Sequence, residues 1–444
     1  MDEMYDVAVI GAGFAGATAA RELATRGHTV VVLEARDVIG GRTHTSRLKN
    51  GELVELGGTF VHWSQPHVWS EITRYGLTAD LVDGTEAPEW ALTPHDGGLR
   101  WTPAEEQLER ETRLMEQFFE GSWNALPRPY QPGHGGEAER LADHKLISER
   151  LSEMGLSPGD RDLLTTFFLT HLAGEDLEDL DRGSVLSELK MWAPAGHTYA
   201  GFMGAVFGYR LRRGTVSLLS AILEDAGSEV RTKSVVRSVK SMADHALITL
   251  ESGGAVRARA VVLATPSGVW ADLDMKPALS ENRVAVSRAG MQIRYVSKGY
   301  MVVRGEPRAV TVMPKQPHPI VMMATSHRNS GDEQTMVFWG TERLGDPTDL
   351  VRLQDAVRSL LPDARVSEAV ARVYDGHDPL TRGGWGLIRA GEQTRIAPDA
   401  TLSAAEGRVF FATADIATGW QGYIDGAIET GIRAARQVRE FFLT

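Results

Sequence analysis

A glycine-rich turn between a short apolar strand and a helix constrains the fold of this chain more than any other feature. Residues 5–10 are apolar and rich in β-forming side chains, and residues 11–16 read GAGFAG. A helical pattern over 17–27 follows and ends at a glycine, and 29–34 reads as a second strand. This order predicts a βαβ unit with two parallel strands and a right-handed crossover, so the chain is of the α/β class.

The three glycines of this turn have the spacing of a dinucleotide-binding site. Gly11 permits the tight turn, Gly13 lets a pyrophosphate approach the backbone, and Gly16 lets helix and strand pack closely. The helix N-terminus then offers free N–H groups and a positive dipole end to the phosphates. Glu34 ends the second strand about 20 residues farther on, where a carboxylate accepts ribose hydroxyls and repels a 2′-phosphate. A glycine turn without a ligand is the alternative, but the combination favours a dinucleotide other than NADP.

A second glycine element stands close behind the acidic residue. Gly40 and Gly41 allow another backbone segment to come close, and Arg42 can pair with a phosphate or cross-link the turn. An NAD enzyme does not need this element. FAD is long and lies extended, so the spacing favours a flavin.

Composition excludes several classes of protein. The length of 444 residues predicts two or three domains. A net charge of −12 argues against a nucleic-acid partner. The chain has no cysteine, which excludes disulfides, thiolate metal sites and cysteine-linked flavin. The histidines do not fall at metal-ligand spacing, so no metal is expected.

The acidic first residues run straight into a strand, and no apolar run reaches ~18 residues. We therefore expect no signal peptide, no transmembrane helix and no membrane partner, and a cytoplasmic location.

The alternation of patterns predicts one nucleotide-binding domain interrupted twice. Strands are scarce between about 80 and 210, where the pattern is helical, and they return over 229–266. A second interruption carries its own strands, and the chain ends in a buried strand and an amphipathic helix over 423–442. We predict a Rossmann-like FAD-binding domain and a substrate-binding domain with a mixed sheet and helices. The FAD-binding segments are 1–80, 210–285 and 390–444, and the substrate-binding segments are 81–209 and 286–389.

At this point the sequence resembles the flavin-containing amine oxidase family over nearly its whole length. The motifs that carry the resemblance are GAGFAGATAAREL, LEARDVIGGRT, ELGGTFVHW, VVLATP, FFATADIA and GYIDGAIETGIRAA. GFAGATAARE and VHWSQPHVWSEITRYGL are similar to the bacterial subgroup that oxidises nicotine, pseudooxynicotine and hydroxynicotine. The resemblance implies the FAD-binding fold of the glutathione-reductase type. Because the chain has no cysteine, we expect the FAD to be held non-covalently. The resemblance implies that these residues contact the cofactor: Gly11, Gly13, Ala15, Gly16, Glu34, Arg36, Gly40, Gly41, Arg42, Gly57, Gly58, Thr59, Val236, Thr265, Asp415, Tyr423 and Ile424.

The resemblance also implies the chemistry. The family oxidises a C–N bond of a small amine to an imine by hydride transfer to flavin N5, and the imine is then hydrolysed or released. Trp385 and Tyr423 match the two rings that flank the amine, and Lys298 matches the lysine near flavin N5. An ordinary core tryptophan, tyrosine or surface lysine is the alternative for each. The electron acceptor that reoxidises the flavin is either oxygen or a redox protein. The oligomeric state is either a monomer or a homodimer.

Two departures from the nicotine-oxidising subgroup leave the substrate open, although amine oxidation is still expected. Asp375, Gly376 and His377 stand where those relatives carry a tryptophan, and Tyr423 stands where nicotine oxidoreductase has asparagine. The substrate is therefore either nicotine-like or another secondary, cyclic or primary amine.

Three other functions compete. An L-amino-acid oxidase would need an arginine for the substrate carboxylate, and Arg210, Arg294 and Arg389 are candidates. An FAD-dependent desaturase or isomerase would lack the aromatic pair and Lys298. A non-catalytic chaperone with a dinucleotide fold would not keep the residues that face the flavin.

Overall fold

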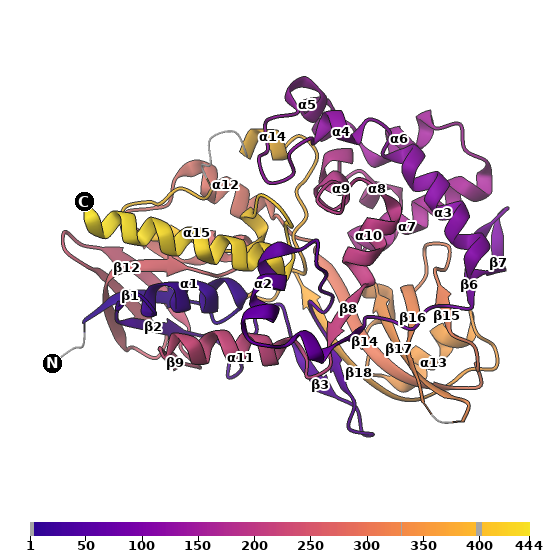
Figure 1. Ribbon diagram of the computed structural model, residues 1–444, viewed down its shortest axis with the longest axis horizontal. Helices are drawn as coiled ribbons and strands as arrows, with labels where there is room; N and C mark the ends of the chain where they lie inside the picture. Colours follow the sequence, from indigo (N-terminus) through magenta and orange to yellow (C-terminus); the bar gives the residue numbers. More distant parts are fainter. Residues whose placement is uncertain (1–3, 330, 397–401) are drawn as a thin grey trace.

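The computed structural model describes residues 4–329, 331–396 and 402–444 and contains two large sheets with helices packed on them (Figure 1). In the first sheet, β1 pairs in parallel with both β2 and β12. The sheet has eight strands in the order β13 (Asp274–Lys276), β10 (Val236–Ser241), β11 (Ala246–Leu250), β12 (Ala255–Leu263), β1 (Met4–Ile10), β2 (Val30–Leu33) and β9 (Glu229–Arg231), with β19 (Val409–Phe411) beside β12.

Helix α1 (Phe14–Ala24) makes the crossover between β1 and β2 and packs against α11 (Thr215–Ala226) and α15 (Ile424–Leu443). Its small side chains are buried because both neighbours lie close to it. A Cβ at Gly431 would stand 2.5 Å from the backbone oxygen of Ala15, so only glycine allows this approach of α15. The three helices lie together on one side of the first sheet (Figure 1).

The second sheet has seven strands, antiparallel throughout except where β15 runs parallel to β6. Helix α13 (Leu350–Arg358) packs on one face of it, in a shared hydrophobic core. The strand order is β18 (Arg365–Asp375), β14 (Tyr295–Arg304), β17 (Glu333–Gly340), β16 (Ile320–Arg328), β15 (Val310–Val312), β6 (Trp90–His95) and β7 (Gly98–Pro103).

A layer of helices covers the other face of the second sheet (Figure 1). Its core joins Phe168, Trp192 and Tyr199 of the helices to Tyr300 and Val337 of the strands. The helices are α3 (Ala104–Phe118), α4 (Ser122–Ala125), α5 (Gly136–His144), α6 (Ile147–Glu153), α7 (Pro158–Leu172), α8 (Leu177–Leu180), α9 (Val185–Trp192) and α10 (Tyr199–Phe207).

Short elements complete the described chain. They are the pairs β3 (Thr45–Arg47) with β4 (Leu53–Glu55) and β5 (Leu81–Asp83) with β8 (Tyr209–Leu211), and the helices α2 (Pro66–Arg74), α12 (Glu281–Ala289) and α14 (Gln393–Ile396).

The expected α/β fold with a second mixed-sheet and helical part is confirmed. All eight strands of the first sheet fall within 1–80, 210–285 and 390–444, and all seven of the second within 81–209 and 286–389. The positions 1–3, 330 and 397–401 of these predicted segments lie outside the described residues.

Two local expectations need correction. The strand pattern over 229–241 is interrupted: it forms β9 at one edge of the sheet and β10, with four strands between them. The region from 80 to 210 has few strands, as expected, and among them β6 and β7 form a hairpin. Its turn uses Asp96 and Gly97, with φ values of 45° and 86°, as primed hairpin turns require. Strand β18, unrecognised in the sequence, forms the edge beside β14. No helix of the described ranges is long and apolar enough to cross a membrane.

Candidate active site

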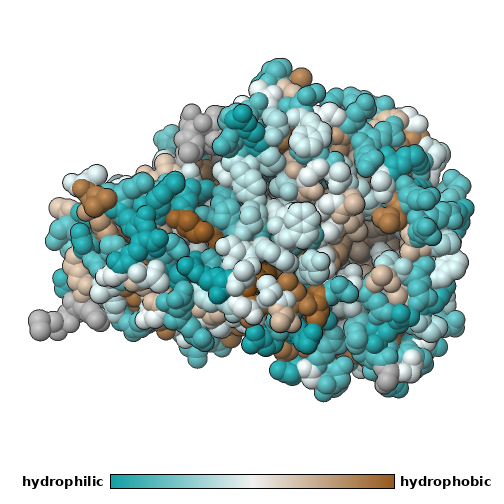
Figure 2. Space-filling model, in the orientation of Figure 1, coloured by the Kyte–Doolittle hydropathy of each residue, from teal (hydrophilic) through white to brown (hydrophobic). Residues whose placement is uncertain are grey.

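A cavity of about 970 Å³ is lined from both sheets and from the helical layer. At one end lie the glycine turn after β1, the segments 34–43 and 57–60, and the start of α15. At the other end lie apolar side chains of α7, α9 and α10 above strands of the second sheet. Figure 2 shows a hollow with hydrophobic walls on the face drawn, between α10 and the strands β15 and β16.

The glycines of the turn have two roles: Gly11 and Gly16 allow close backbone contacts, and Gly13 leaves cavity space unfilled. A Cβ at Gly16 would stand 1.9 Å from the backbone oxygen of Gly11, so Gly16 serves the contact between helix and turn. Gly11 has a φ of 108°, and a Cβ there would stand 2.9 Å from the backbone oxygen of Ala264. A Cβ at Gly13 would meet protein atoms no closer than 3.7 Å and would occupy cavity space. Gly13 therefore keeps a cradle open.

The cradle fits the phosphates and polar groups of a dinucleotide. Gly13 is the N-cap of α1 and Tyr423 that of α15, and neither helix start has a side-chain hydrogen bond at its cap. Free N–H groups at two helix starts favour an anionic ligand. Thr265 lines the same space, and its buried hydroxyl has no hydrogen-bond partner within the protein. These residues would hold FAD.

Glu34 organises the turn and also lines the cavity. One carboxylate oxygen accepts the N–H of Ala12 at 2.8 Å, and the other accepts that of Arg36 at 2.9 Å. The predicted ribose contact would use lone pairs that these bonds leave free.

Arg42 reaches from the 34–43 segment to the end of β19. Its guanidinium donates to Asp415 at 2.6 Å, and to the carbonyl oxygen of Gly384 and the hydroxyl of Thr413, each at 3.3 Å. Asp415 is fully buried and also accepts from the backbone N–H and hydroxyl of Ser267. The ion pair therefore joins the 34–43 segment to the end of β19 at the cofactor end of the cavity.

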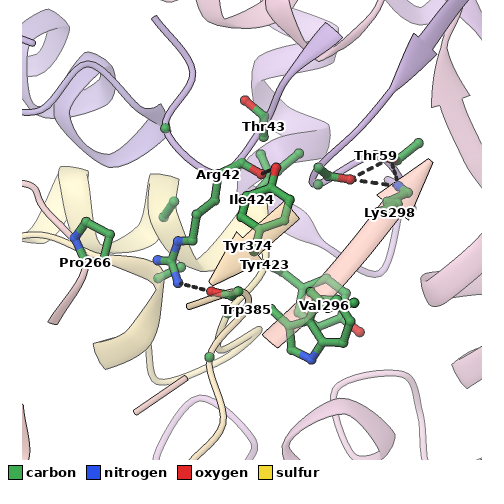
Figure 3. Close-up of a pocket in the computed structure, with 18 of the residues that line it drawn as sticks. Arg42, Thr43, Thr59, Pro266, Val296, Lys298, Tyr374, Trp385, Tyr423 and Ile424 are labelled. Carbon is green, nitrogen blue, oxygen red and sulfur yellow. Dashed lines mark hydrogen bonds between the residues drawn. The ribbon is translucent and has the colours of Figure 1, made fainter. Parts of the chain in front are cut away.

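Lys298 lies on β14 and holds the 57–59 segment. Its ammonium donates to the carbonyl oxygen of Gly57 at 2.8 Å and to the hydroxyl of Thr59 (Figure 3). Phe60 and Trp339 present their rings to it, with centroids 5.2 and 5.4 Å away. Burial lowers the pKa of Lys298 to about 7, although the nearby Glu55 opposes that shift. Burial therefore favours the neutral amine of Lys298 more strongly than water does.

Trp385 and Tyr423 face the cavity from different supports. Trp385 packs against Ile293, Val296 and Tyr374, and its indole N–H donates to the carbonyl oxygen of His171 at 3.0 Å. Tyr423 packs on the helical layer, and its hydroxyl donates to the sulfur of Met191 at 3.1 Å. Burial raises the pKa of Tyr423, and the carboxylate of Glu188 adds to the shift. Both rings are therefore held by specific contacts.

Most of the residues expected at the site line this cavity, and two do not. Gly16 and Asp415 stand behind it and support residues that line it. The cavity is lined by the expected residues Gly11, Gly13, Ala15, Glu34, Arg36, Gly40, Gly41, Arg42, Gly57, Gly58, Thr59, Val236, Thr265, Lys298, Trp385, Tyr423 and Ile424.

Several lining residues were missed in the sequence. Tyr374 is the last residue but one of the unrecognised strand β18, and its hydroxyl donates to the carbonyl oxygen of Arg42 at 3.2 Å. His171 and Glu188 sit on α7 and α9, joined by a 3.0 Å contact between Nδ1 and a carboxylate oxygen. Glu111 is a fourth. None belongs to a local motif, so only the packing of distant elements identifies them.

The arginines considered for a substrate carboxylate lie elsewhere. Arg210, Arg294 and Arg389 do not line the cavity. The arginines that do, Arg36, Arg42 and Arg237, are in the cofactor segments. Within the described ranges, no group of three or more carboxylate and imidazole side chains could hold a metal ion.

Comparison with known proteins defines the family. A family model described as flavin-containing amine oxidoreductase matches residues 14–439. A pseudooxynicotine dehydrogenase of Pseudomonas sp is 34% identical over 442 residues, which cover 98% of this chain and 86% of that protein. A nicotine dehydrogenase of Pseudomonas putida is 32% identical over 438 residues, covering 98% and 88%. A solved structure of a putrescine oxidase double mutant has a TM-score of 0.80 at 20% identity, covering 98% and 99%.

The chain belongs to the flavin-containing amine oxidoreductase family, and it is an FAD-dependent enzyme that oxidises amines. The predicted family, cofactor and class of reaction are confirmed. The likeness to putrescine oxidase confirms the fold.

Proposed function

We propose that this enzyme oxidises a compact amine with an apolar body, at a site formed by Trp385, Tyr423 and Lys298. The observation that carries the proposal is one cavity in which these three residues meet both the cofactor segments and an apolar helical wall. Residues of the first sheet's segments would hold FAD, and those of the second sheet and helices would hold the amine. The names of the two bacterial relatives support a nicotine-like amine as one candidate.

FAD supplies the hydride acceptor, and the chain supplies orientation and a dry environment. Trp385 and Tyr423 present ring faces that attract a cationic amine as it enters. The apolar side chains around them then favour the neutral amine, because burial disfavours charge. Met191 and His171 restrain the two rings through the hydrogen bonds described above, so the amine meets fixed walls.

An amine is favoured over an α-amino acid by the charges of the cavity. No arginine lines its substrate end among the described residues, and Lys190 and Lys298 are the lysines that line it. Lys190 donates to the carbonyl oxygen of Thr418 at 2.5 Å, and burial lowers its pKa to about 8. Retention of Trp385, Tyr423 and Lys298 argues against a desaturase or isomerase.

A panel of amines mixed with the yellow enzyme in the absence of air tests this function. Bleaching of the flavin absorbance by secondary, cyclic or primary amines is the expected result. Faster bleaching by α-amino acids than by the matching amines without a carboxylate would replace the proposal with an amino-acid oxidase. No bleaching by any amine would refute it.

We also propose that FAD is held without a covalent bond, because the chain has no cysteine and the cradle offers many polar contacts. Acid precipitation is expected to leave yellow flavin in the supernatant. Flavin that stays in the pellet would contradict this and indicate a bond to another side chain such as histidine.

Lys298→Met is expected to slow reoxidation by oxygen more than reduction by amine, if oxygen is the acceptor. A positive charge near the flavin favours electron transfer to oxygen, and methionine removes it. Because the pKa of Lys298 is lowered to about 7, the ammonium dominates below pH 7 and the neutral amine above it. The oxygen reaction of the unmodified enzyme should therefore slow as pH rises through about 7, and that of the variant should not.

Stopped-flow measurement of the two half-reactions tests this, with Lys190→Met as the control for another buried lysine of the same cavity. Equal losses in both half-reactions would give Lys298 another role. A slow oxygen reaction in the unmodified enzyme at every pH would indicate a redox protein as the acceptor.

A further inference from the structure

One row of side chains crosses the floor of the cavity along the second sheet. Lys298 on β14 pairs with Trp339 on β17, which pairs with Met322 on β16. Met313 follows β15 at the next position of the row, and its N–H donates to the carbonyl oxygen of Leu92 on β6. Neighbouring strands lie about 4.8 Å apart, so the row from β14 to β6 spans about 19 Å. The cavity extends far beyond the immediate surroundings of Lys298.

Glu111 closes the far end of this row. It lies on α3, and its side chain lines the cavity. Gln107, one turn before it, donates to one carboxylate oxygen at 2.7 Å, and the Tyr199 hydroxyl donates to the other at 2.5 Å. Gln107 in turn accepts from Thr93 on β6 at 3.1 Å. The carboxyl group is therefore fixed in place above β6.

No ion pair forms with this carboxyl group in the part of the chain that the structure describes. The charge of the adjacent Arg110 acts on it without an ion pair, because the guanidinium of Arg110 pairs with Asp160 at 2.8 Å. Burial raises the pKa of Glu111, and the hydrogen bonds from Gln107 and Tyr199 and the charge of Arg110 partly offset that effect. Glu188, a buried acid of the helical wall of the same cavity, has His171 beside it. Glu111 is half-buried, and a carboxylate withdrawn from water without an ion-pair partner is costly unless a ligand supplies that partner.

The space between the two ends is apolar. Met322 and Met313 form the floor, and Met203 and Phe207 of α10 and Phe167 of α7 form walls. A molecule that fills it carries polar groups at its ends and hydrocarbon between them.

We propose that Glu111 determines specificity by binding a second basic nitrogen of the substrate, at the opposite end from the C–N bond that is oxidised. This rests on the proposed amine oxidation and names its substrate class as elongated amines with two nitrogens. The second nitrogen is an alkylammonium or a pyridine nitrogen. An ionised Glu111 accepts a hydrogen bond from an alkylammonium, and a protonated Glu111 donates one to a pyridine nitrogen.

A chain-length series of α,ω-diamines, each compared with the monoamine of equal length, tests binding of an alkylammonium. Pyridylalkylamines, compared with the matching phenylalkylamines, test binding of a pyridine nitrogen. The rate of flavin bleaching without air, measured against concentration, gives the apparent Kd for each compound. The unmodified enzyme should bind the best two-nitrogen compound at least about tenfold more tightly than its one-nitrogen partner, the scale of one charge-assisted hydrogen bond.

Glu111→Gln should abolish this preference while leaving the Kd of monoamines unchanged. Glu105→Gln is the matched control, because Glu105 lies on the same helix and lines the same cavity but is exposed at its mouth. It removes the same charge and should keep the preference. Glu111→Asp keeps the charge and withdraws it by one methylene, so it should shift the preferred diamine to a longer chain.

Three outcomes would overturn the proposal and leave amine oxidation standing. One is equal affinity for diamines and monoamines in the unmodified enzyme. Another is equal loss of preference in Glu111→Gln and Glu105→Gln, which would show a long-range effect of charge. The third is a uniform loss for all amines in Glu111→Gln together with an unchanged optimum in Glu111→Asp, which would show a structural role. Failure of every amine to bleach the flavin would instead refute the proposed function.

Discussion

Arg42→Ala is expected to lower the free energy of unfolding of the apoprotein by about 3 kcal/mol. The substitution leaves the carboxylate of Asp415 fully buried without its cation, and breaking a buried ion pair in this way costs about 3–5 kcal/mol. The lower end applies because Ser267 still donates twice to Asp415 and Thr413 donates once. Urea unfolding of the FAD-free protein measures the loss as a lower midpoint.

Arg36→Ala is the control that separates burial from charge. Arg36 pairs with Asp378 at the same distance of 2.6 Å, but the two side chains are 30% and 26% exposed. Exposed pairs contribute about 0–1 kcal/mol, so this variant should unfold close to the unmodified protein. Similar midpoints for the two variants would contradict the role given to the Arg42 pair. Recovery of the midpoint of Arg42→Ala by Asp415→Asn in the same chain would support it, because the uncompensated charge is then gone.

The parts of the fold that depend on neighbouring residues could be predicted from the sequence. The turn with Gly11, Gly13 and Gly16 lies between β1 and α1 as expected, because its geometry is set within one βαβ unit. The start of α15 at Ile424 could also be placed, since the glycine before it and the long amphipathic pattern after it are local signals.

The far half of the cavity could not be predicted, because it depends on pairings between distant segments. Strand β6 joins the second sheet through a parallel pairing of Leu92 with Val312. Nothing in the residues around 92 indicates that partner, although the Asp96-Gly97 dipeptide is a local signal of the hairpin itself. Glu111 therefore reads as one more polar residue of an amphipathic helix in the sequence. Its place in the cavity follows from β6 and α3 together.

Trp385→Ala is expected to slow reduction by a good amine substrate by about tenfold to a hundredfold, or 1.4–2.7 kcal/mol. The ring is one of the two walls that orient the amine, and it is fixed by packing on Ile293 and Val296. Tyr423→Ala, which removes the other wall, should reduce the rate on the same scale. Anaerobic stopped-flow measurement of flavin bleaching gives the rate directly.

The variants Trp385→Phe and Trp63→Ala show which property of Trp385 matters. Phenylalanine keeps a ring but loses the N–H that donates to the carbonyl oxygen of His171, so a small loss would assign the effect to the ring face. A loss as large as that of alanine would assign it to the hydrogen bond, which then positions the ring. Trp63 is 64% exposed and does not line the cavity, so its removal should leave the rate unchanged. Unchanged kinetics in both Trp385→Ala and Tyr423→Ala would refute the aromatic site, because an amine that needs neither wall is oriented by other residues of the cavity.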